Sequence, residues 1–200
     1  MDDAKLWFFY GAMGSSKTAN ALMVRFNYHE RGMKAALLKP KSESRDGKHI
    51  VKSRIGIEGD CVYVEDFLDQ VDRGKIPEVD AIIIDEAQFL TPKQADELMQ
   101  IVTELDIPVM AYGLRLNFRL TDGGFEGATR LLQIAHDIDE IKTICECGRK
   151  ATCNARFLNG KFVADGPDVL IDDGKTEIEY RAICPKCFAK YKKEKYKPAR

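Results

Sequence analysis

Three observations predict an α/β fold with a central parallel sheet and a small β-rich module after it. A glycine-rich loop links a short apolar run to a helical pattern near the N-terminus. Apolar strands and amphipathic helices then alternate up to about residue 141, which is typical of a parallel sheet. Finally, two close pairs of cysteines enclose a segment with hairpin signals, which indicates a structural metal site.

The composition limits the classes of protein to consider. The chain has 200 residues and a formal net charge of −1, so it forms one large domain or one core with a small appendage. The neutral balance gives no reason to expect nucleic-acid binding, and we interpret the basic stretch 190–200 as a solvated tail. Because a signal-peptide pattern and apolar runs of ~20 residues are both absent, we expect a cytoplasmic protein without a membrane span.

The first predicted strand, 6–10, leads into a phosphate-binding loop. The template is Gly, four residues, Gly, Lys and then Ser or Thr, and only Ser16 departs from it, at the second glycine. Backbone N–H groups and the positive end of the next helix surround the phosphates, while Lys17 adds a charge and Thr18 reaches Mg²⁺. We expect strain at Ser16, because glycine avoids a Cβ there. The predicted nucleotide contacts are Gly11, Ala12, Met13, Gly14, Ser15, Ser16, Lys17 and Thr18. The alternative is a small-residue turn that merely caps a helix.

The pattern of alternating elements continues after this loop. The first helix ends near Gly32, and a second strand is predicted at 35–38. The polar segment 39–52 shows no period, and it is either a loop that folds over the nucleotide or a disordered surface excursion. Another strand is predicted at 61–64, followed by an amphipathic helix.

The run 79–84, which is apolar apart from Asp80, ends in two adjacent carboxylates, Asp85 and Glu86. A strand this apolar is buried on both faces, as in the centre of a parallel sheet, and such sheets bind ligands at the carboxyl ends of their strands. Asp85 is therefore a candidate for orienting Mg²⁺ and its waters, and Glu86 for general base. The alternative, solvated loop carboxylates, is disfavoured by the phosphate loop upstream.

The next helix has a clear start signal. Thr91 is its predicted cap, Pro92 its first residue, and Gln94 follows three residues after the cap. A strand at 107–112 comes next. The segment 113–119, which contains Phe118 and two arginines, leaves the carboxyl end of that strand and suits a planar substrate that can be phosphorylated. The alternative is that each of these residues has only a structural role.

Near residue 141 the pattern changes to a β-rich module. Asn159 and Gly160 lie between two apolar runs and predict a hairpin. The expected ligands of a tetrahedral Zn²⁺ ion, whose binding energy would replace the core that so small a module lacks, are Cys145, Cys147, Cys184 and Cys187. The first pair is tighter than usual, so Cys153 is an alternative ligand, and buried free cysteines are the alternative to a metal site. Cys61 is expected in the core.

The chain resembles the cellular-type (type II) thymidine kinases from about residue 7 to about residue 188. The resemblance is carried, in order, by Gly11-Ala12-Met13, Lys17-Thr18, Asp85-Glu86-Ala87-Gln88-Phe89, Tyr112-Gly113-Leu114-Arg115, Phe118-Arg119, Cys147-Gly148-Arg149-Lys150-Ala151-Thr152 and Tyr180. It implies a RecA-like P-loop core at 1–141, a zinc-anchored lasso domain at 142–190 and a basic tail at 191–200.

The resemblance also implies an activity, which is transfer of the γ-phosphate of ATP to the 5′-hydroxyl of thymidine or deoxyuridine to give dTMP. Glu86 would take the hydroxyl proton, and Arg45 and Gln88 would join the nucleotide site. The implied substrate contacts are Met13, Phe89, Leu114, Phe118, Arg156, Val169, Leu170, Ile171 and Tyr180. A homotetramer and feedback inhibition by dTTP are implied as well.

Several residues depart from the family pattern, namely Ser16, Asn117, Asn154 and the Asp172-Asp173 pair. Two further hypotheses stay open. One is a RecA-like ATPase that depends on nucleic acid, although no long basic stripe with interleaved aromatic residues is present. The other is a nucleotide-binding module without catalytic activity.

Overall fold

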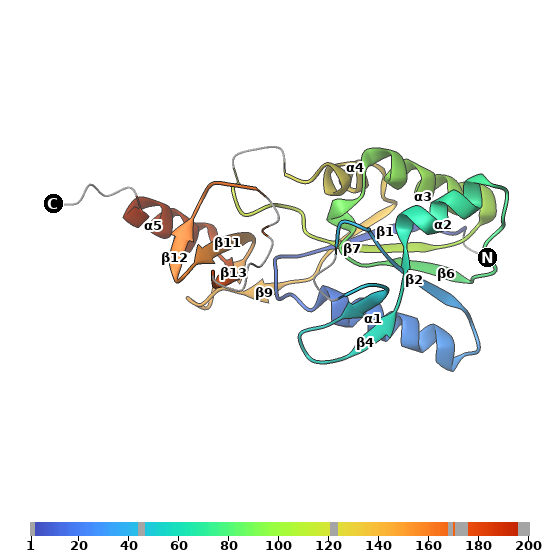
Figure 1. The fold of residues 1–200 in the computed structure, drawn as a ribbon, viewed down its shortest axis with the longest axis horizontal. Coiled ribbons are helices and arrows are strands. Elements are labelled where there is room, and N and C mark those ends of the chain that lie inside the picture. The colour runs from blue at the N-terminus through green and yellow to red at the C-terminus, as the bar shows by residue number, and fades with distance from the viewer. Residues whose placement is uncertain (1–2, 44–46, 121–123, 168–169, 171–175, 196–200) are drawn as a thin grey trace.

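The computed structural model describes residues 3–43, 47–120, 124–167, 170 and 176–195 (Figure 1). Its largest element is a six-stranded sheet in the order β5-β2-β6-β7-β1-β8, and every neighbouring pair of strands is parallel. These strands are β1 (Leu6–Tyr10), β2 (Ala35–Lys39), β5 (Val62–Tyr63), β6 (Ala81–Ile84), β7 (Val109–Gly113) and β8 (Asp137–Glu140). The predicted parallel sheet is confirmed.

Helices cover both faces of this sheet (Figure 1). One face packs against α1 (Lys17–Glu30), and the other packs against α2 (Val64–Asp72), α3 (Pro92–Leu105) and α4 (Glu126–Ile134). Side chains alternate along β6, so Ile82 and Ile84 join the cluster under α3 while Ile83 joins the cluster that contains Leu22 of α1. The strand is continuously apolar because both of its faces are buried. No described helix is both long and apolar enough to cross a membrane.

The start of α3 follows its sequence signal. The Thr91 hydroxyl accepts a hydrogen bond from the Gln94 N–H at 3.2 Å, and the Gln94 side chain accepts one from the Thr91 N–H at 2.8 Å. Pro92 occupies the first turn, where its missing N–H costs nothing. The predicted capping box is therefore confirmed.

Several elements have no counterpart in the pattern analysis. Both α4 and the edge strand β8 lie between residues 119 and 141, where no element was expected. The sequence of β8 is Asp-Ile-Asp-Glu, which shows no apolar periodicity. It is a strand because its backbone pairs with that of β1. The polar segment after β2 also contains a short hairpin, β3 (Ile50–Lys52) with β4 (Glu58–Asp60). A 3₁₀ turn, η1 (Ala87–Phe89), follows β6.

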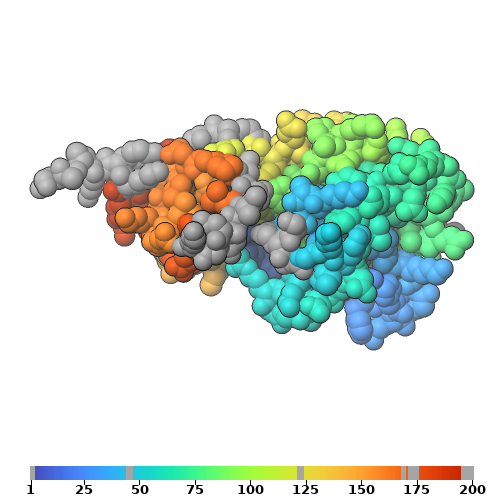
Figure 2. Space-filling view, viewed as in Figure 1, coloured from blue at the N-terminus to red at the C-terminus, as the bar shows by residue number. Residues whose placement is uncertain are grey.

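The C-terminal module forms one end of an elongated molecule (Figures 1 and 2). It contains β9 (Thr143–Ile144), β10 (Lys150–Ala151), β11 (Cys153–Leu158), β12 (Lys161–Val163), β13 (Ile178–Ile183) and α5 (Pro185–Lys195). Asn159 and Gly160 both have positive φ, 48° and 73°, as a two-residue hairpin turn requires. Because α5 continues to Lys195 and Tyr191 stacks on Phe162, the start of the basic stretch is helical. Lys190, Lys192 and Lys193 are exposed, which agrees with our interpretation of this stretch as solvated. The proposed domain boundaries stay a prediction.

Candidate active site

The P-loop joins β1 to α1 in a conformation that its small residues permit. A Cβ on Gly11 would lie 2.3 Å from the Ile141 carbonyl oxygen, so no other residue fits there. Ser16 takes a left-handed conformation with φ 63° and caps α1, and its carbonyl accepts the Asn20 N–H at 2.9 Å. For a residue other than glycine this conformation costs about 1–2 kcal/mol. Ser16 therefore carries backbone strain, while the loop keeps its turn. The crowding expected between its Cβ and a phosphate stays a prediction.

The charges around this loop favour an anion. The Lys17 ammonium donates to the carbonyl oxygens of Gly11 at 3.0 Å and Ala12 at 2.9 Å, and to the Ser15 hydroxyl at 3.3 Å. The first turn of α1 carries no acidic side chain. No acidic side chain of α1 itself therefore neutralises the positive end of the helix dipole, which adds to the Lys17 charge.

Asp85 lies at the carboxyl end of β6 and is only 4% exposed. Burial and, secondly, the neighbouring Glu86 carboxylate raise the pKa of the Asp85 carboxyl to about 7, while a hydrogen bond from the Thr18 hydroxyl and the Lys17 charge oppose the shift. The Asp85–Thr18 pair therefore joins the acidic strand end to the P-loop helix. A carboxylate beside a hydroxyl is a suitable partner for the water shell of Mg²⁺.

The burial of Asp85 predicts a dependence of stability on pH. The unfolded carboxyl loses its proton near 3.8 and the folded one near 7, so the free energy of unfolding falls as the pH rises through this window. Asp85→Asn removes the penalty and retains an acceptor for Thr18. Without ligand, we expect it to be more stable than the parent protein at pH 8 by about 1 kcal/mol or more, and equally stable at pH 4.

Urea unfolding at the two pH values measures this difference. Asp72→Asn, which removes an exposed carboxyl, is the control and should leave the stability unchanged at both values. An Asp85→Asn variant that is less stable than the parent at pH 8 would contradict the prediction.

Glu86 is held by a buried amide. Its backbone is left-handed, with φ 54°, at the turn from β6 into η1. The Gln88 side chain, 2% exposed, donates its Nε2–H to the Glu86 carboxylate and accepts the Leu114 N–H at 2.9 Å. A Cβ on Gly113 would lie 2.9 Å from the Gln88 backbone nitrogen, so glycine is needed there. Gln88 thus fixes the candidate base against the end of β7.

One cavity of about 360 Å³ joins these groups to an aromatic pocket. The predicted site residues that line it are Met13, Gly14, Ser16, Lys17, Thr18, Glu86, Gln88, Phe89, Leu114, Phe118, Leu170 and Tyr180. Gly11, Ala12, Ser15, Asp85 and Arg156 lie outside its lining. Arg45, Val169 and Ile171, together with the Asp172-Asp173 pair, lie outside the described residues.

Arg156 supports the pocket wall from behind. It is 1% exposed, and its guanidinium donates to the carbonyl oxygens of Pro167 and Asp165, each at 2.6 Å. The same group lies 3.7 Å from the centre of the Phe118 ring, a distance at which a cation is attracted to the ring face. Arg156 therefore fixes Phe118 and the segment after β12, whereas the family resemblance implied a contact with the substrate.

The cavity also contains residues that the sequence did not assign to a site, namely Ala19, Glu43, Lys52, Ser53, Arg54, Ile55, Asn117, Phe125 and Asn154. Asn154 of this set connects two distant segments of the chain. Its Oδ1 accepts the Met13 N–H at 2.8 Å and its Nδ2 donates to the Leu116 carbonyl at 2.9 Å, so it ties the C-terminal module to the P-loop. Residues 52–55 of this set belong to the β3–β4 hairpin. In the sequence, only the turn glycine at position 56 and the basic residues before it could have indicated that this hairpin lines the cavity.

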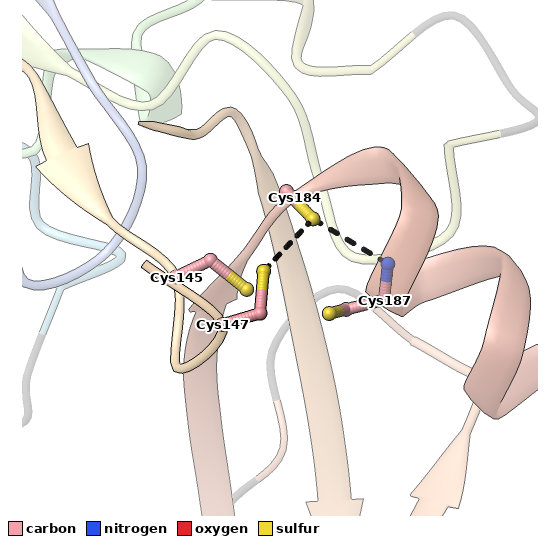
Figure 3. A group of neighbouring side chains, drawn as sticks. All are labelled: Cys145, Cys147, Cys184 and Cys187. Atoms are coloured by element: carbon pink, nitrogen blue, oxygen red, sulfur yellow. Dashed lines mark hydrogen bonds between the residues drawn. The ribbon is translucent and has the colours of Figure 1, made fainter. Parts of the chain in front are cut away.

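The four cysteines of the two pairs meet at the base of the C-terminal module (Figure 3). Their sulfur atoms all lie within 4.8 Å of one another, and those of Cys147 and Cys184 are 3.6 Å apart. A tetrahedral Zn²⁺ ion with Zn–S bonds of about 2.3 Å requires sulfur separations of about 3.8 Å, so the set fits zinc. The Arg149 N–H lowers the pKa of the Cys147 thiol to about 6, which favours the thiolate. Cys153 is buried and does not belong to this group of described residues.

The fold and this geometry are those of a P-loop nucleotide-binding protein in which a module with four clustered cysteines lies beside the cavity. More narrowly, the chain belongs to the thymidine kinase family, whose model matches residues 4–188.

Individual relatives agree with this assignment. The thymidine kinase of Francisella tularensis subsp. holarctica is 39% identical over 192 residues, which cover 92% of this chain and 95% of the relative. That of Streptococcus gordonii is 42% identical over 190 residues, covering 94% and 97%. Among solved structures, the Pif1 helicase from Candida albicans is 14% identical over 71% of this chain and 36% of its own, with a TM-score of 0.43, too low to support a functional argument.

Proposed function

We propose that the protein transfers the γ-phosphate of ATP to the 5′-hydroxyl of thymidine or deoxyuridine. The observation that carries the proposal is the single cavity in which P-loop residues, the Glu86 carboxylate and an aromatic pocket meet. Membership of the thymidine kinase family supports the same reaction and supports ATP as the donor.

The P-loop residues bind the donor. The backbone N–H groups of the loop and Lys17 hold the triphosphate, and Thr18 with Asp85 would hold Mg²⁺ and its water shell. Mg²⁺ would neutralise charge on the phosphate oxygens. Because Asp85 already hydrogen-bonds Thr18, these two residues need no rearrangement to face the same ion.

The aromatic pocket binds the acceptor. Phe89 packs edge-on against Phe125, with ring centres 5.5 Å apart, and Phe118 is clamped by Arg156. These rigid walls favour a planar pyrimidine, and Met13, Leu114 and Tyr180 complete the lining. Glu86 takes the proton of the 5′-hydroxyl as the new P–O bond forms, and the Gln88 amide keeps its carboxylate in place.

A panel of nucleosides tested as acceptors with Mg-ATP is the direct test. We expect thymidine and deoxyuridine to be phosphorylated at the 5′ position, and purine nucleosides to be rejected, as membership of the thymidine kinase family implies. ATP hydrolysis that depends on single-stranded DNA and ignores nucleosides would favour the nucleic-acid-dependent ATPase instead. Thymidine binding in calorimetry without product at any Mg²⁺ concentration would favour a module without catalytic activity.

We also propose, from the family resemblance, a homotetramer that dTTP inhibits. The outer face of α1 supports self-association, because Met23 and Phe26 are 54% and 60% exposed. Light scattering measures the mass in solution, and inhibition by dTTP that competes with thymidine or ATP would support feedback. We further propose that the protein binds a structural zinc ion and is located in the cytoplasm. All six cysteines are free of disulfide bonds, which is consistent with a reducing compartment.

A further inference from the structure

The tip of the β3–β4 hairpin, residues 53–57, borders the same cavity as the P-loop. The buried Ser53 fixes this tip. Its hydroxyl donates to the Ile57 carbonyl at 3.0 Å and accepts the Ile57 N–H at 3.2 Å, and its own N–H donates to the Ile57 carbonyl at 2.8 Å. Gly56, at φ 88°, permits the tight turn. The hairpin therefore presents Arg54 to the cavity from an ordered turn.

Arg54 lies beside the phosphate-binding loop. A Cβ built on Gly14 would lie 3.7 Å from the Arg54 Nη1 atom, so the guanidinium lies beside the loop at Gly14. In Figure 1 the hairpin that carries it reaches past β4 toward the start of α1.

Arg54 also differs from the other cations of the cavity. Lys17 donates to three oxygens of its own loop, and Lys52 pairs with Glu58 at 3.3 Å. For Arg54, no hydrogen bond or ion pair is formed within the described part of the chain. The carboxylates that line the same cavity are Glu43 and Glu86, and neither is paired with Arg54. A guanidinium that has no counter-ion among the described residues and lies next to an anion-binding loop is available to a phosphate.

We infer that Arg54 contacts the terminal phosphates of the nucleotide in the P-loop and stabilises the transferring phosphoryl group. The catalytic part of this inference rests on the proposed kinase function. In that reaction the bond from the γ-phosphorus to the ADP oxygen breaks, a bond to the 5′-oxygen forms, and the hydroxyl proton passes to Glu86. Charge is spread over the three outer phosphoryl oxygens, and a guanidinium can donate to two of them at once. Arg54 forms no covalent bond and acts only through charge and hydrogen bonds.

Steady-state kinetics of three variants test the inference. Arg54→Gln should lower kcat about a hundredfold, the effect of losing one donor to transition-state charge, and leave the KM for thymidine unchanged. Arg54→Lys should retain part of kcat, because it keeps the charge and loses the bidentate geometry. Arg31→Gln, which removes an exposed arginine at the far end of α1, should behave as the parent protein. Because Arg54 is exposed and makes no hydrogen bond or ion pair with the described residues, both Arg54 variants should keep the parent melting temperature.

Calorimetry separates this inference from the proposed function. Arg54→Gln should bind the Mg²⁺ complex of a non-hydrolysable ATP analogue about tenfold more weakly, as expected for a lost charge-assisted hydrogen bond, and bind AMP as well as the parent does. If the parent protein fails to phosphorylate any nucleoside, the proposed function fails, and the weaker analogue binding still supports the phosphate contact. A kcat and an analogue affinity of Arg54→Gln that both stay within about twofold of the parent values would overturn the inference.

Discussion

Replacing Glu86 with glutamine is expected to reduce kcat about a thousandfold while Mg-ATP still binds. General-base catalysis contributes roughly 10²–10⁴ in rate, and the glutamine amide cannot accept the hydroxyl proton. The change is nearly isosteric, and the new side-chain oxygen can still accept the hydrogen bond from Gln88 that Glu86 accepts now. The P-loop contacts of the donor are unaffected, so calorimetry should give an unchanged affinity for a non-hydrolysable ATP analogue.

The matched control is Glu78→Gln, which removes a carboxylate that is 92% exposed and remote from the cavity. It should leave both kcat and nucleotide affinity unchanged. Thymidine phosphorylation at the parent rate by Glu86→Gln would remove the general base from the proposed mechanism. A loss of turnover accompanied by a loss of nucleotide binding would indicate that Glu86 holds the metal or the donor instead.

Disruption of the cysteine cluster is the second change with a large expected effect. Cys184→Ser should abolish zinc binding and unfold the C-terminal module, because metal binding supplies folding free energy that so small a core lacks. The module places Asn154 on the P-loop and Tyr180 in the cavity. We therefore expect the thymidine affinity to fall at least about tenfold, the loss typical of disturbing the surroundings of a metal site.

Metal analysis, near-ultraviolet circular dichroism and thermal melting measure the loss independently of activity. Cys153→Ala is the control, since this thiol is buried outside the cluster. It should retain one zinc ion per chain and bind thymidine normally. Equal zinc content and melting temperature in Cys184→Ser and the parent would show that the cluster is not a structural metal site, and zinc loss in Cys153→Ala would make Cys153 the fourth ligand.

Local sequence signals predicted the parts of the fold that depend on period and turn chemistry. The apolar runs predicted the central strands, and Thr91 with Gln94 predicted the start of α3. Asn159-Gly160 predicted the hairpin of the C-terminal module. Each of these features is decided within a few residues of chain. The edge strand β8 and helix α4 were missed because their order depends on neighbours that are distant in sequence, such as the pairing of β8 with β1.

By itself, the sequence determined which chemistry the protein carries: a phosphate-binding loop, an acidic strand end and two thiol pairs, all readable from residue type and spacing. Only the tertiary structure decided which other side chains complete the site. The hydrogen bond between Asn154 and Met13 joins residues 141 positions apart, and Arg54 reaches Gly14 from a hairpin that carries no strong pattern. Contacts of this kind depend on how packed elements orient one another, and no local period in the chain records them.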